Sequence, residues 1–299
     1  RIGSDFSGHS LSRFNASALV HLSLVHALDF AALLILSTVL HPFYARTSVQ
    51  LPLGGIQGFS KPGLSVFLGI PYAVPPVGNL RFSVSQPAQP WSGTLQATSY
   101  EPLCMQPGLG LPMSEDCLYV NIWVPEGAKS TVTRRRSHLN PNEEIEIVQG
   151  DTPVMVWIHG GAYQLGGATS PIYPGEELAR RTGNIVVVLQ YRLGPLGFIT
   201  TQGMVNEDRR QNHGLLDQQL ALAFINRYIG YFGGNASAVC IFGESAGGGS
   251  VAWHLINEAS WPYFARAIAQ SPGPPMYPTL KAALSMGQSV ASKAGCPQS

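Results

Sequence analysis

Ser245 is the residue with the clearest potential for nucleophilic chemistry. It stands in the stretch Gly243-Glu244-Ser245-Ala246-Gly247, a G-x-S-x-G arrangement. The apolar run AVCIF before it and the run AGGGSVAWHLI after it predict a buried strand, a sharp turn and a helix. Such a turn holds a serine in a strained conformation with its hydroxyl exposed above the sheet, and flanking glycines leave room for close packing. Ser245 is therefore the candidate nucleophile, and the alternative is a plain helix N-cap.

A second glycine-rich turn could stabilise the negative charge that forms when a nucleophile attacks a carbonyl group. The stretch WIHGGAY ends an apolar run and contains His159-Gly160-Gly161-Ala162. It resembles the HGGG-type loop whose backbone N–H groups bind a tetrahedral oxyanion, with Ala162 in place of the third glycine. Taken alone, the loop could also be an ordinary glycine turn. His159 is interpreted as a structural residue that orients the loop.

A serine nucleophile needs a base and an acid, which follow the serine along the chain in folds with this turn. After Ser245 only His254 and Glu258 are available. His254 lies nine residues further on, which is about 13 Å along one helix, whereas a base must come within about 3 Å of the hydroxyl. Glu258 is more distant still, so neither residue is predicted to serve Ser245.

Other ionisable residues near these motifs are given structural roles. Glu244 adjoins Ser245 and is interpreted as a buried structural carboxylate that the turn directs away from the serine. His213 and Asp217 lie in NHGLLDQ, before the serine. Helix capping and burial explain them better than catalysis does.

The segments around these residues alternate between buried strands and helices. Continuous apolar runs bounded by glycine are typical of parallel strands that are buried on both faces. The runs at 153–158, 185–189 and 238–242 fit this description, and helical patterns at 176–181 and 214–228 lie between them. This order predicts an α/β fold with a doubly wound, mostly parallel sheet.

The earlier part of the chain differs in character. Residues 118–124 alternate and predict a strand, whereas the proline- and glycine-rich segment 54–91 predicts edge strands and loops. Residues 126–152 are polar, charged and without apolar periodicity, which predicts a mobile surface insertion. Residues 1–47 resemble a secretory signal, because a basic residue precedes a short apolar stretch. A transmembrane anchor is the alternative, but it would place Asp29 in lipid.

Composition excludes some classes of partner. The formal net charge is +1 and only 12% of the residues are charged, so no basic face for nucleic acid is expected. The four cysteines lack the C-x-x-C spacing of zinc sites, and neither a metal nor a cofactor is expected. Membrane association is expected only through the leader, if the leader is retained.

Several long motifs together resemble the type-B carboxylesterase family, which includes cholinesterases and fungal secreted esterases and lipases. The motifs are FLGIPYAVPPVGNLRF, SEDCLYVNIWVP, PVMVWIHGGAY, YRLGPLGF, NHGLLDQQLAL and FGGNASAVCIFGESAGG, in the order of the family. The resemblance implies the α/β-hydrolase fold, with an antiparallel N-terminal portion of the sheet. It also implies that Ser245 is the nucleophile and that the N–H groups of Gly161, Ala162 and Ala246 bind the oxyanion.

The resemblance further implies a disulfide and an incomplete domain. Cys104 is implied to pair with Cys117, and the sequence AGC at Cys296 resembles the first half of a second family disulfide. In the family the glutamate and histidine of the catalytic triad come later than the part matched by this sequence. Residues 48–299 are therefore expected to form the N-terminal part of a catalytic domain, truncated at its C-terminus. The first residue, which is Arg1 and not methionine, also suggests a piece of a longer chain.

Two functions from different classes remain open at this point. The first is a secreted carboxylic ester hydrolase that acts on small-molecule or lipid esters through a serine acyl-enzyme, and the alternative is a non-catalytic, cholinesterase-like binding or adhesion module. A peptidase or lyase on the same fold is a third possibility. The loop 105–116 is shorter than the lid of the family's lipases, which favours soluble esters with shorter acyl chains. Asn235-Ala236-Ser237 is a glycosylation sequon just before a buried strand, for which partial occupancy at best is expected.

Overall fold

The computed structural model describes residues 45–108, 110–136, 144–169, 175–207, 210–272 and 278–296. The chain divides into two compact units, residues 1–44 and residues 45–299. The first unit holds most of the predicted leader and lies outside the described residues, so the fold presented is that of the second unit. Arg46 and Thr47 fall within the predicted leader, yet both belong to the first strand of the sheet, where they pair with Phe59 and Gly58.

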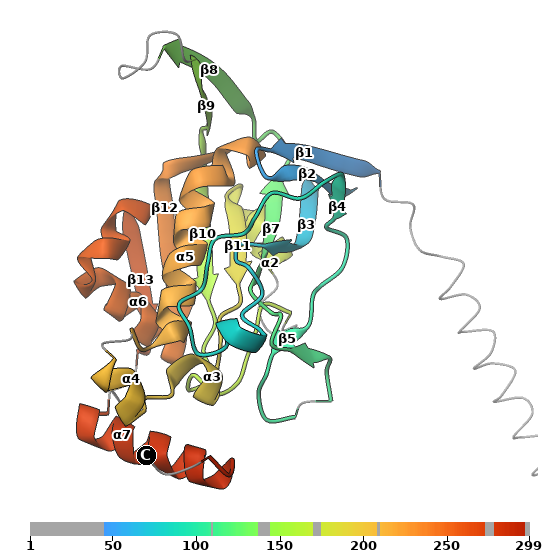
Figure 1. Cartoon of the computed structure of the whole chain (residues 1–299). Coiled ribbons are helices and arrows are strands. Elements are labelled where there is room, and N and C mark those ends of the chain that lie inside the picture. Colours follow the sequence, from blue (N-terminus) through green and yellow to red (C-terminus); the bar gives the residue numbers. More distant parts are fainter. Residues whose placement is uncertain are drawn as a thin grey trace, which may run out of the picture. The chain divides into compact units, whose positions relative to one another are not determined.

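A mixed sheet forms the centre of the second unit (Figure 1). Its strands, in spatial order, are β1 (Arg46–Leu51), β2 (Gly54–Lys61), β3 (Leu64–Pro71), β7 (Tyr119–Pro125), β11 (Ile185–Leu189), β10 (Thr152–Ile158), β12 (Gly234–Glu244) and β13 (Arg266–Gln270), with β4 (Thr94–Gln96) beside β2. Neighbours from β11 to β13 run parallel, whereas neighbours from β1 to β11 run antiparallel. The predicted α/β-hydrolase sheet with an antiparallel N-terminal portion is confirmed.

The apolar runs of the parallel strands are continuous because both faces of these strands are covered. All five residues of β11 are buried. Val187 belongs to the larger core cluster, whereas Val186 and Val188 belong to a smaller cluster that includes Trp157. Successive side chains of a strand point to opposite faces, so one apolar run supplies two cores.

The segment 54–91 contains an interior strand, so the prediction of edge strands and loops is wrong for this part. β3 pairs with β2 on one side and with β7 on the other, and it is buried from Val66 to Ile70. The flanking prolines and glycines obscure its short apolar run LSVFLGI. Gly69, with φ of +74°, lies where the register to β7 shifts, a conformation that favours glycine.

Helices cover both faces of the sheet, as the alternating pattern predicts. α5 (His213–Tyr228) and α6 (Ala246–Ile256) contribute buried residues to the larger cluster, and α2 (Gly175–Thr182) contributes Ala179 to the smaller one. The remaining helices are α3 (Gly194–Phe198), α4 (Gln202–Asn206), α7 (Leu280–Lys293), η1 (Gly78–Leu80), η2 (Ile229–Phe232) and η3 (Glu258–Tyr263). α6 begins at the turn that carries Ser245, and α5 is joined to α6 by a hydrogen bond from Gln218 to Ser250.

The predicted insertion contains an antiparallel ribbon that joins β7 to β10. Its strands are β8 (Ser130–Arg136) and β9 (Glu144–Gly150), and it extends beyond one end of the main sheet (Figure 1). The segment therefore has more regular structure than its composition indicates. β9 begins with the alternation Glu-Ile-Glu-Ile, which is a strand signal within this polar segment. Arg134 is paired across the ribbon with Glu146 at 3.7 Å.

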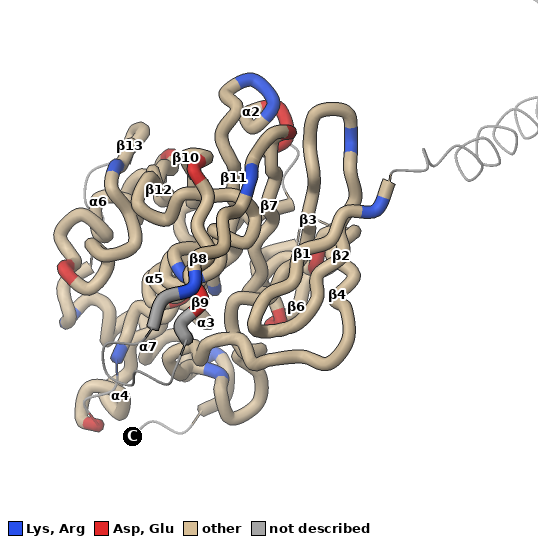
Figure 2. Tube along the Cα trace, turned by 90° about the horizontal axis from the view of Figure 1, so that it is seen from above, with Lys and Arg blue, Asp and Glu red and all other residues tan. Residues whose placement is uncertain are grey.

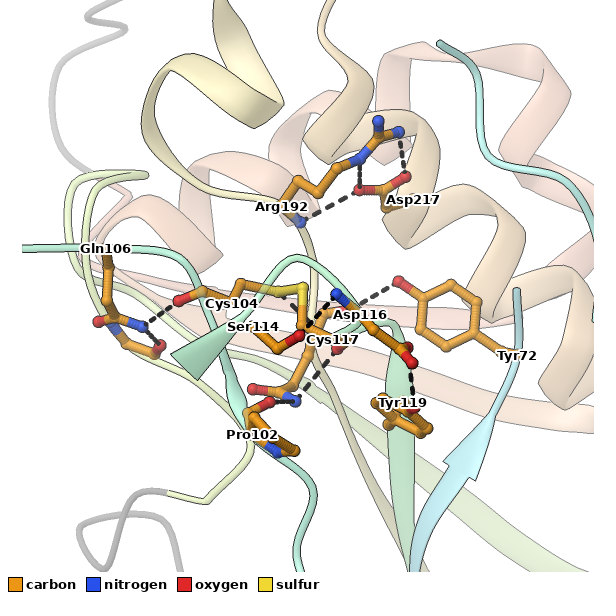
Figure 3. Close-up of a disulfide and its surroundings, with 12 residues drawn as sticks. Tyr72, Pro102, Cys104, Gln106, Ser114, Asp116, Cys117, Tyr119, Arg192 and Asp217 are labelled. Atoms are coloured by element: carbon orange, nitrogen blue, oxygen red, sulfur yellow. Dashed lines mark hydrogen bonds and ion pairs between the residues drawn. A yellow bond between two sulfur atoms is a disulfide. The ribbon is translucent and has the colours of Figure 1, made fainter. Parts of the chain in front are cut away.

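A disulfide joins Cys104 to Cys117, as the family resemblance implies (Figure 3). The short strands β5 (Leu103–Cys104) and β6 (Met113–Ser114) pair within the loop that it closes. Gln190, just after β11, donates a hydrogen bond from Nε2 to the carbonyl oxygen of Cys117 at 3.1 Å. The loop is thus fastened to the end of a central strand.

Charged residues are scattered over the second unit, with both signs interspersed (Figure 2). Across the described ranges, the helices are all too short or too polar to span a membrane.

Candidate active site

Ser245 lies at the sharp turn between β12 and α6 that the sequence predicts. Its φ of 57° and ψ of −121° fall in a region that residues with side chains seldom occupy. The Ser245 N–H donates to the carbonyl oxygen of Gln270 at 3.0 Å, because β13 runs beside β12. Its side chain makes no capping hydrogen bond to α6, so the N-cap alternative finds no support. The half-buried hydroxyl stands at the N-terminus of α6, where the helix dipole favours negative charge.

The glycines on either side of Ser245 are required by the packing of the turn against β10. A Cβ on Gly247 would lie 2.0 Å from the carbonyl oxygen of Ile158, and a Cβ on Gly243 would lie 2.6 Å from the same oxygen. Both separations are far below van der Waals contact. The G-x-S-x-G spacing therefore lets the turn and the first turn of α6 approach the end of β10.

The loop after β10 has an unusual backbone at the residues predicted to bind an oxyanion. Gly161, Ala162 and Tyr163 have consecutive positive φ values of 111°, 53° and 57°. Such conformations are costly for residues other than glycine and persist only where neighbouring structure holds them. One such restraint is the hydrogen bond from the Gly194 N–H to the carbonyl oxygen of Tyr163 at 2.7 Å. Nothing in the sequence indicated that Tyr163 would adopt a positive φ.

The loop and the serine turn lie against each other. A Cβ on Gly160 would be 3.2 Å from the Cβ of Ser245, so the backbone of the loop passes directly beside the serine. The three predicted donors are the N–H groups of Gly161 and Ala162, which follow Gly160 in the loop, and of Ala246, which follows Ser245 in the turn. Within the described ranges none of the three donates to a backbone carbonyl. The structure thus places the loop that holds Gly161 and Ala162 beside the turn that holds Ser245.

His159 is a buried residue of the loop, in agreement with the structural role predicted for it. Its Nδ1 lies 2.8 Å from the carbonyl oxygen of Gly160, and its ring stacks on Tyr191 at a centroid distance of 4.4 Å. Tyr191 in turn donates from its hydroxyl to the carbonyl oxygen of His159 at 2.8 Å. Burial lowers the pKa of His159 to about 4, so the ring is neutral at pH 7.

His254 is held in a buried polar network at the far end of α6 from Ser245. Its Nδ1 lies 2.9 Å from Ser260 Oγ, and its Nε2 lies 3.2 Å from Gln218 Oε1. Gln218 donates to Ser250 Oγ at 3.0 Å, and Ser250 donates to the carbonyl oxygen of Ala246 at 3.0 Å. Burial lowers the pKa of His254 to about 3. Both ring nitrogens are engaged away from the serine, which agrees with its exclusion as a base. The network itself joins two helices and leaves no motif in the sequence.

Asp217 forms a buried ion pair with Arg192, which accounts for its position in α5 without a catalytic role. The guanidinium donates from Nε and Nη2 to the two carboxylate oxygens at 2.8 and 2.7 Å (Figure 3). Arg192 and Asp217 are only 4% and 0% exposed, so each charge depends on the other. His213, at the start of α5, is buried as well.

Glu244 is exposed, so its prediction as a buried carboxylate is wrong. It is the last residue of β12, and its carboxylate lies beside the glycine loop, where a Cβ on Gly160 would be 3.4 Å from Oε2. Glu258 begins η3 and is exposed too. Within the described residues no group of three or more histidine, cysteine or acidic side chains is placed to hold a metal ion.

Comparisons with known proteins agree with this geometry. The family model described as "Carboxylesterase family" matches residues 45–299. The chain is 42% identical to an acetylcholinesterase of Bungarus fasciatus over 76% of its length, which covers 37% of that protein. It is 41% identical to a para-nitrobenzyl esterase of Bacillus subtilis over 75% of its length, which covers 43% of that protein.

Solved structures give the same result. A PNB esterase structure superposes with a TM-score of 0.72 and 38% identity, covering 84% of this chain and 49% of the esterase chain. The chain thus spans about half the length of this structure and less than half of the two relatives. The match over residues 45–299, with the serine turn and the glycine loop in place, shows that the chain belongs to the carboxylesterase family.

Proposed function

We propose that the complete protein is a carboxylic ester hydrolase that works through a serine acyl-enzyme, with Ser245 as the nucleophile. The observation that carries the proposal is the strained turn at Ser245, whose hydroxyl does not cap the helix and stands beside a loop with three left-handed residues. Strain of this kind is kept at functional sites, where it presents a side chain or a backbone donor.

The proposed reaction has two steps. Ser245 Oγ attacks the ester carbonyl carbon and loses its proton to a general base, while the carbonyl oxygen becomes an oxyanion. The N–H groups of Gly161, Ala162 and Ala246 bind that oxyanion, and each donor of this type contributes about 3 kcal/mol to transition-state binding. The alcohol then leaves with the proton, and water attacks the acyl-enzyme by the same route to release the acid and restore the serine.

We infer that the general base and its acid follow residue 299 in the complete family domain. Two facts support this inference. The rings of His159 and His254 are buried and engaged with other partners, and the PNB esterase structure has a further half with no counterpart in this chain. The 299-residue chain alone is therefore proposed to be inactive.

The substrates proposed are carboxylic esters of small molecules. The names of the relatives, an acetylcholinesterase and a para-nitrobenzyl esterase, support this class. The short disulfide loop 105–116 favours esters dissolved in water over esters at an oil interface. We also propose that the protein is secreted and glycosylated, in keeping with its disulfide. The alternative of a non-catalytic binding module has less support, because binding alone does not require a serine in a strained backbone conformation.

The proposal is tested by labelling with a fluorophosphonate and by turnover of p-nitrophenyl acetate. The complete protein is expected to take up one label at Ser245, and Ser245→Ala is expected to lose both the label and the turnover. Ser237→Thr, which changes an exposed serine on the same strand, serves as the control and should keep both.

Two results would contradict the proposal. Label retained by the Ser245→Ala variant would show that another residue is the nucleophile. Turnover by the 299-residue chain that disappears in Ser245→Ala would place a base within this chain, and the inference about the missing half would then be wrong.

A further inference from the structure

The sequon Asn235-Ala236-Ser237 has no role in the proposed site. The only other N-x-S/T sequence in the chain is Asn15-Ala16-Ser17, in the predicted leader. From the sequence, Asn235 looks poorly placed for modification because a buried strand follows it directly. The structure gives a different view of this segment.

Asn235 lies in a bulge at the start of β12. Thr152 pairs with Gly234 and Val154 pairs with Val239, so the residues 235–238 stand opposite Pro153 alone. Proline has no N–H to donate to a ladder, and bulges form where strand pairing fails in this way. The sequon is therefore lifted out of the regular sheet, although β12 becomes a buried strand from Val239 onward.

Within the bulge, the sequon presents its reactive groups outward. Ala236 packs against the core, and neighbouring side chains of an extended segment point the opposite way. Ser237 is accordingly exposed and Asn235 is half-buried. Asn226 Nδ2 lies 3.4 Å from the carbonyl oxygen of Ala236, a contact from α5 that helps to hold this arrangement.

The side chain of Asn235 is oriented by a local hydrogen bond that leaves its nitrogen available. Its Oδ1 accepts from the Ser237 N–H at 2.9 Å. Its Nδ2 donates no hydrogen bond within the described residues, and it is not among the buried polar atoms that lack a partner, so it retains some exposure to solvent. The amide nitrogen is the atom that receives an N-linked glycan.

We propose that Asn235 is an N-glycosylation site that is fully used when the chain passes through the secretory pathway. In that reaction Nδ2 loses a proton and forms a bond to the anomeric carbon of an oligosaccharide, whose lipid pyrophosphate carrier leaves. The inference rests on the secretion proposed above for its biological setting. It differs from the expectation drawn from the sequence, which allowed only partial occupancy.

The site is placed so that a glycan leaves the catalytic turn free. Along β10, six residue steps separate the pairs Thr152↔Gly234 and Ile158↔Gly243, which is about 20 Å at the usual rise of a strand. Asn235 and Ser245 are therefore at opposite ends of β12. The sequon lies instead near η3, because Asn226 Nδ2 contacts the carbonyl oxygens of both Ala236 and Pro262 at 3.4 Å.

The test is expression of the complete protein with its own leader in insect cells, alongside the same protein with residues 1–44 replaced by a heterologous signal sequence. Digestion with an N-glycanase converts a glycosylated asparagine into aspartate, which mass spectrometry locates. We expect this conversion at Asn235 in nearly all of the secreted material. Asn235→Gln and Ser237→Ala should abolish the glycan, Ser237→Thr should retain it, and Asn15→Gln in the protein with its own leader should leave the modification of Asn235 unchanged.

The outcomes separate the site from the secretion on which it depends. Secreted material with unmodified or half-modified Asn235, from cells that glycosylate a reporter fully, would overturn the inference. Full modification behind the heterologous signal, combined with retention in the cytosol of the protein with its own leader, would support the site and refute the proposed secretion. Ser237→Ala and Ser237→Thr change the same exposed residue. A folding defect would affect both variants, whereas the proposal expects only Ser237→Ala to lose the glycan.

Discussion

Replacement of His254 by asparagine should reduce the amount by which the free energy of unfolding falls on acidification. His254 is fully buried, and burial lowers its pKa from 6.5 to about 3. Both ring nitrogens are engaged with uncharged partners, Ser260 and Gln218, and no carboxylate is hydrogen-bonded to the ring. A positive charge on this ring would therefore lose its hydration without compensation.

The sign and the size of the effect follow from proton linkage. In the unfolded chain His254 titrates near 6.5, so below this pH the unfolded state binds a proton that the native state excludes. Its contribution to stability is complete above pH 6.5 and is lost as the pH falls toward the folded pKa of about 3. The loss is about 1.4 kcal/mol per pH unit, or roughly 2.7 kcal/mol between pH 6.5 and about pH 4.5. His159, whose pKa burial lowers to about 4, adds a loss of similar size over the same range.

The assay is urea unfolding of the native chain and of His254→Asn at a series of pH values from about 7.5 to about 4.5. Asparagine keeps a polar atom near Ser260 but does not titrate. The variant should be less stable at neutral pH, yet its free energy of unfolding should fall by about 2.7 kcal/mol less on acidification. His159→Asn is the matched second site, and the two effects should add because the residues share no hydrogen-bond partner. Parallel stability curves for the native chain and His254→Asn would refute the reasoning.

Three further predictions concern the backbone and the disulfide. Ser245→Gly should be more stable than Ser245→Ala by about 1 kcal/mol, because both lack the hydroxyl but only glycine relieves the strain; equal stabilities in urea would contradict the strain. Gly247→Ala should cost about 3 kcal/mol through overpacking, since its methyl would lie 2.0 Å from a carbonyl oxygen of β10. The matched change Gly203→Ala, in open space on α4, should gain about 0.5–1 kcal/mol, and a similar loss for both would show that the clash is not the cause. Replacing Cys104 and Cys117 together by alanine should cost about 3 kcal/mol for a loop of this length, and an unchanged melting temperature would argue against it.

The sequence by itself determined the local features of this protein. The turn at Ser245 follows from steric rules, because a buried strand, a small-residue turn and a helix within fifteen residues leave few backbone paths. The strands β10 to β12 and the helix α5 were predictable for a similar reason, since an apolar run or a helical repeat records which faces are buried. The resemblance of several long motifs to one family supplied the α/β-hydrolase form of the predicted sheet and the pairing of the disulfide, which no local pattern contains.

The tertiary structure decided every feature that depends on which segments become neighbours. β3 is interior because β7 pairs with it from about fifty to sixty residues away, and the composition of β3 does not indicate that partner. His254 finds a partner for its Nε2 in Gln218, 36 residues away in the chain, and Glu244 is exposed although it ends a strand of the core sheet. The bulge at Asn235 forms because Pro153, on the neighbouring strand, cannot donate a ladder hydrogen bond. The periodicity of apolar residues indicates which side chains of a segment are buried. Which other segment buries them is decided only when the sheet assembles.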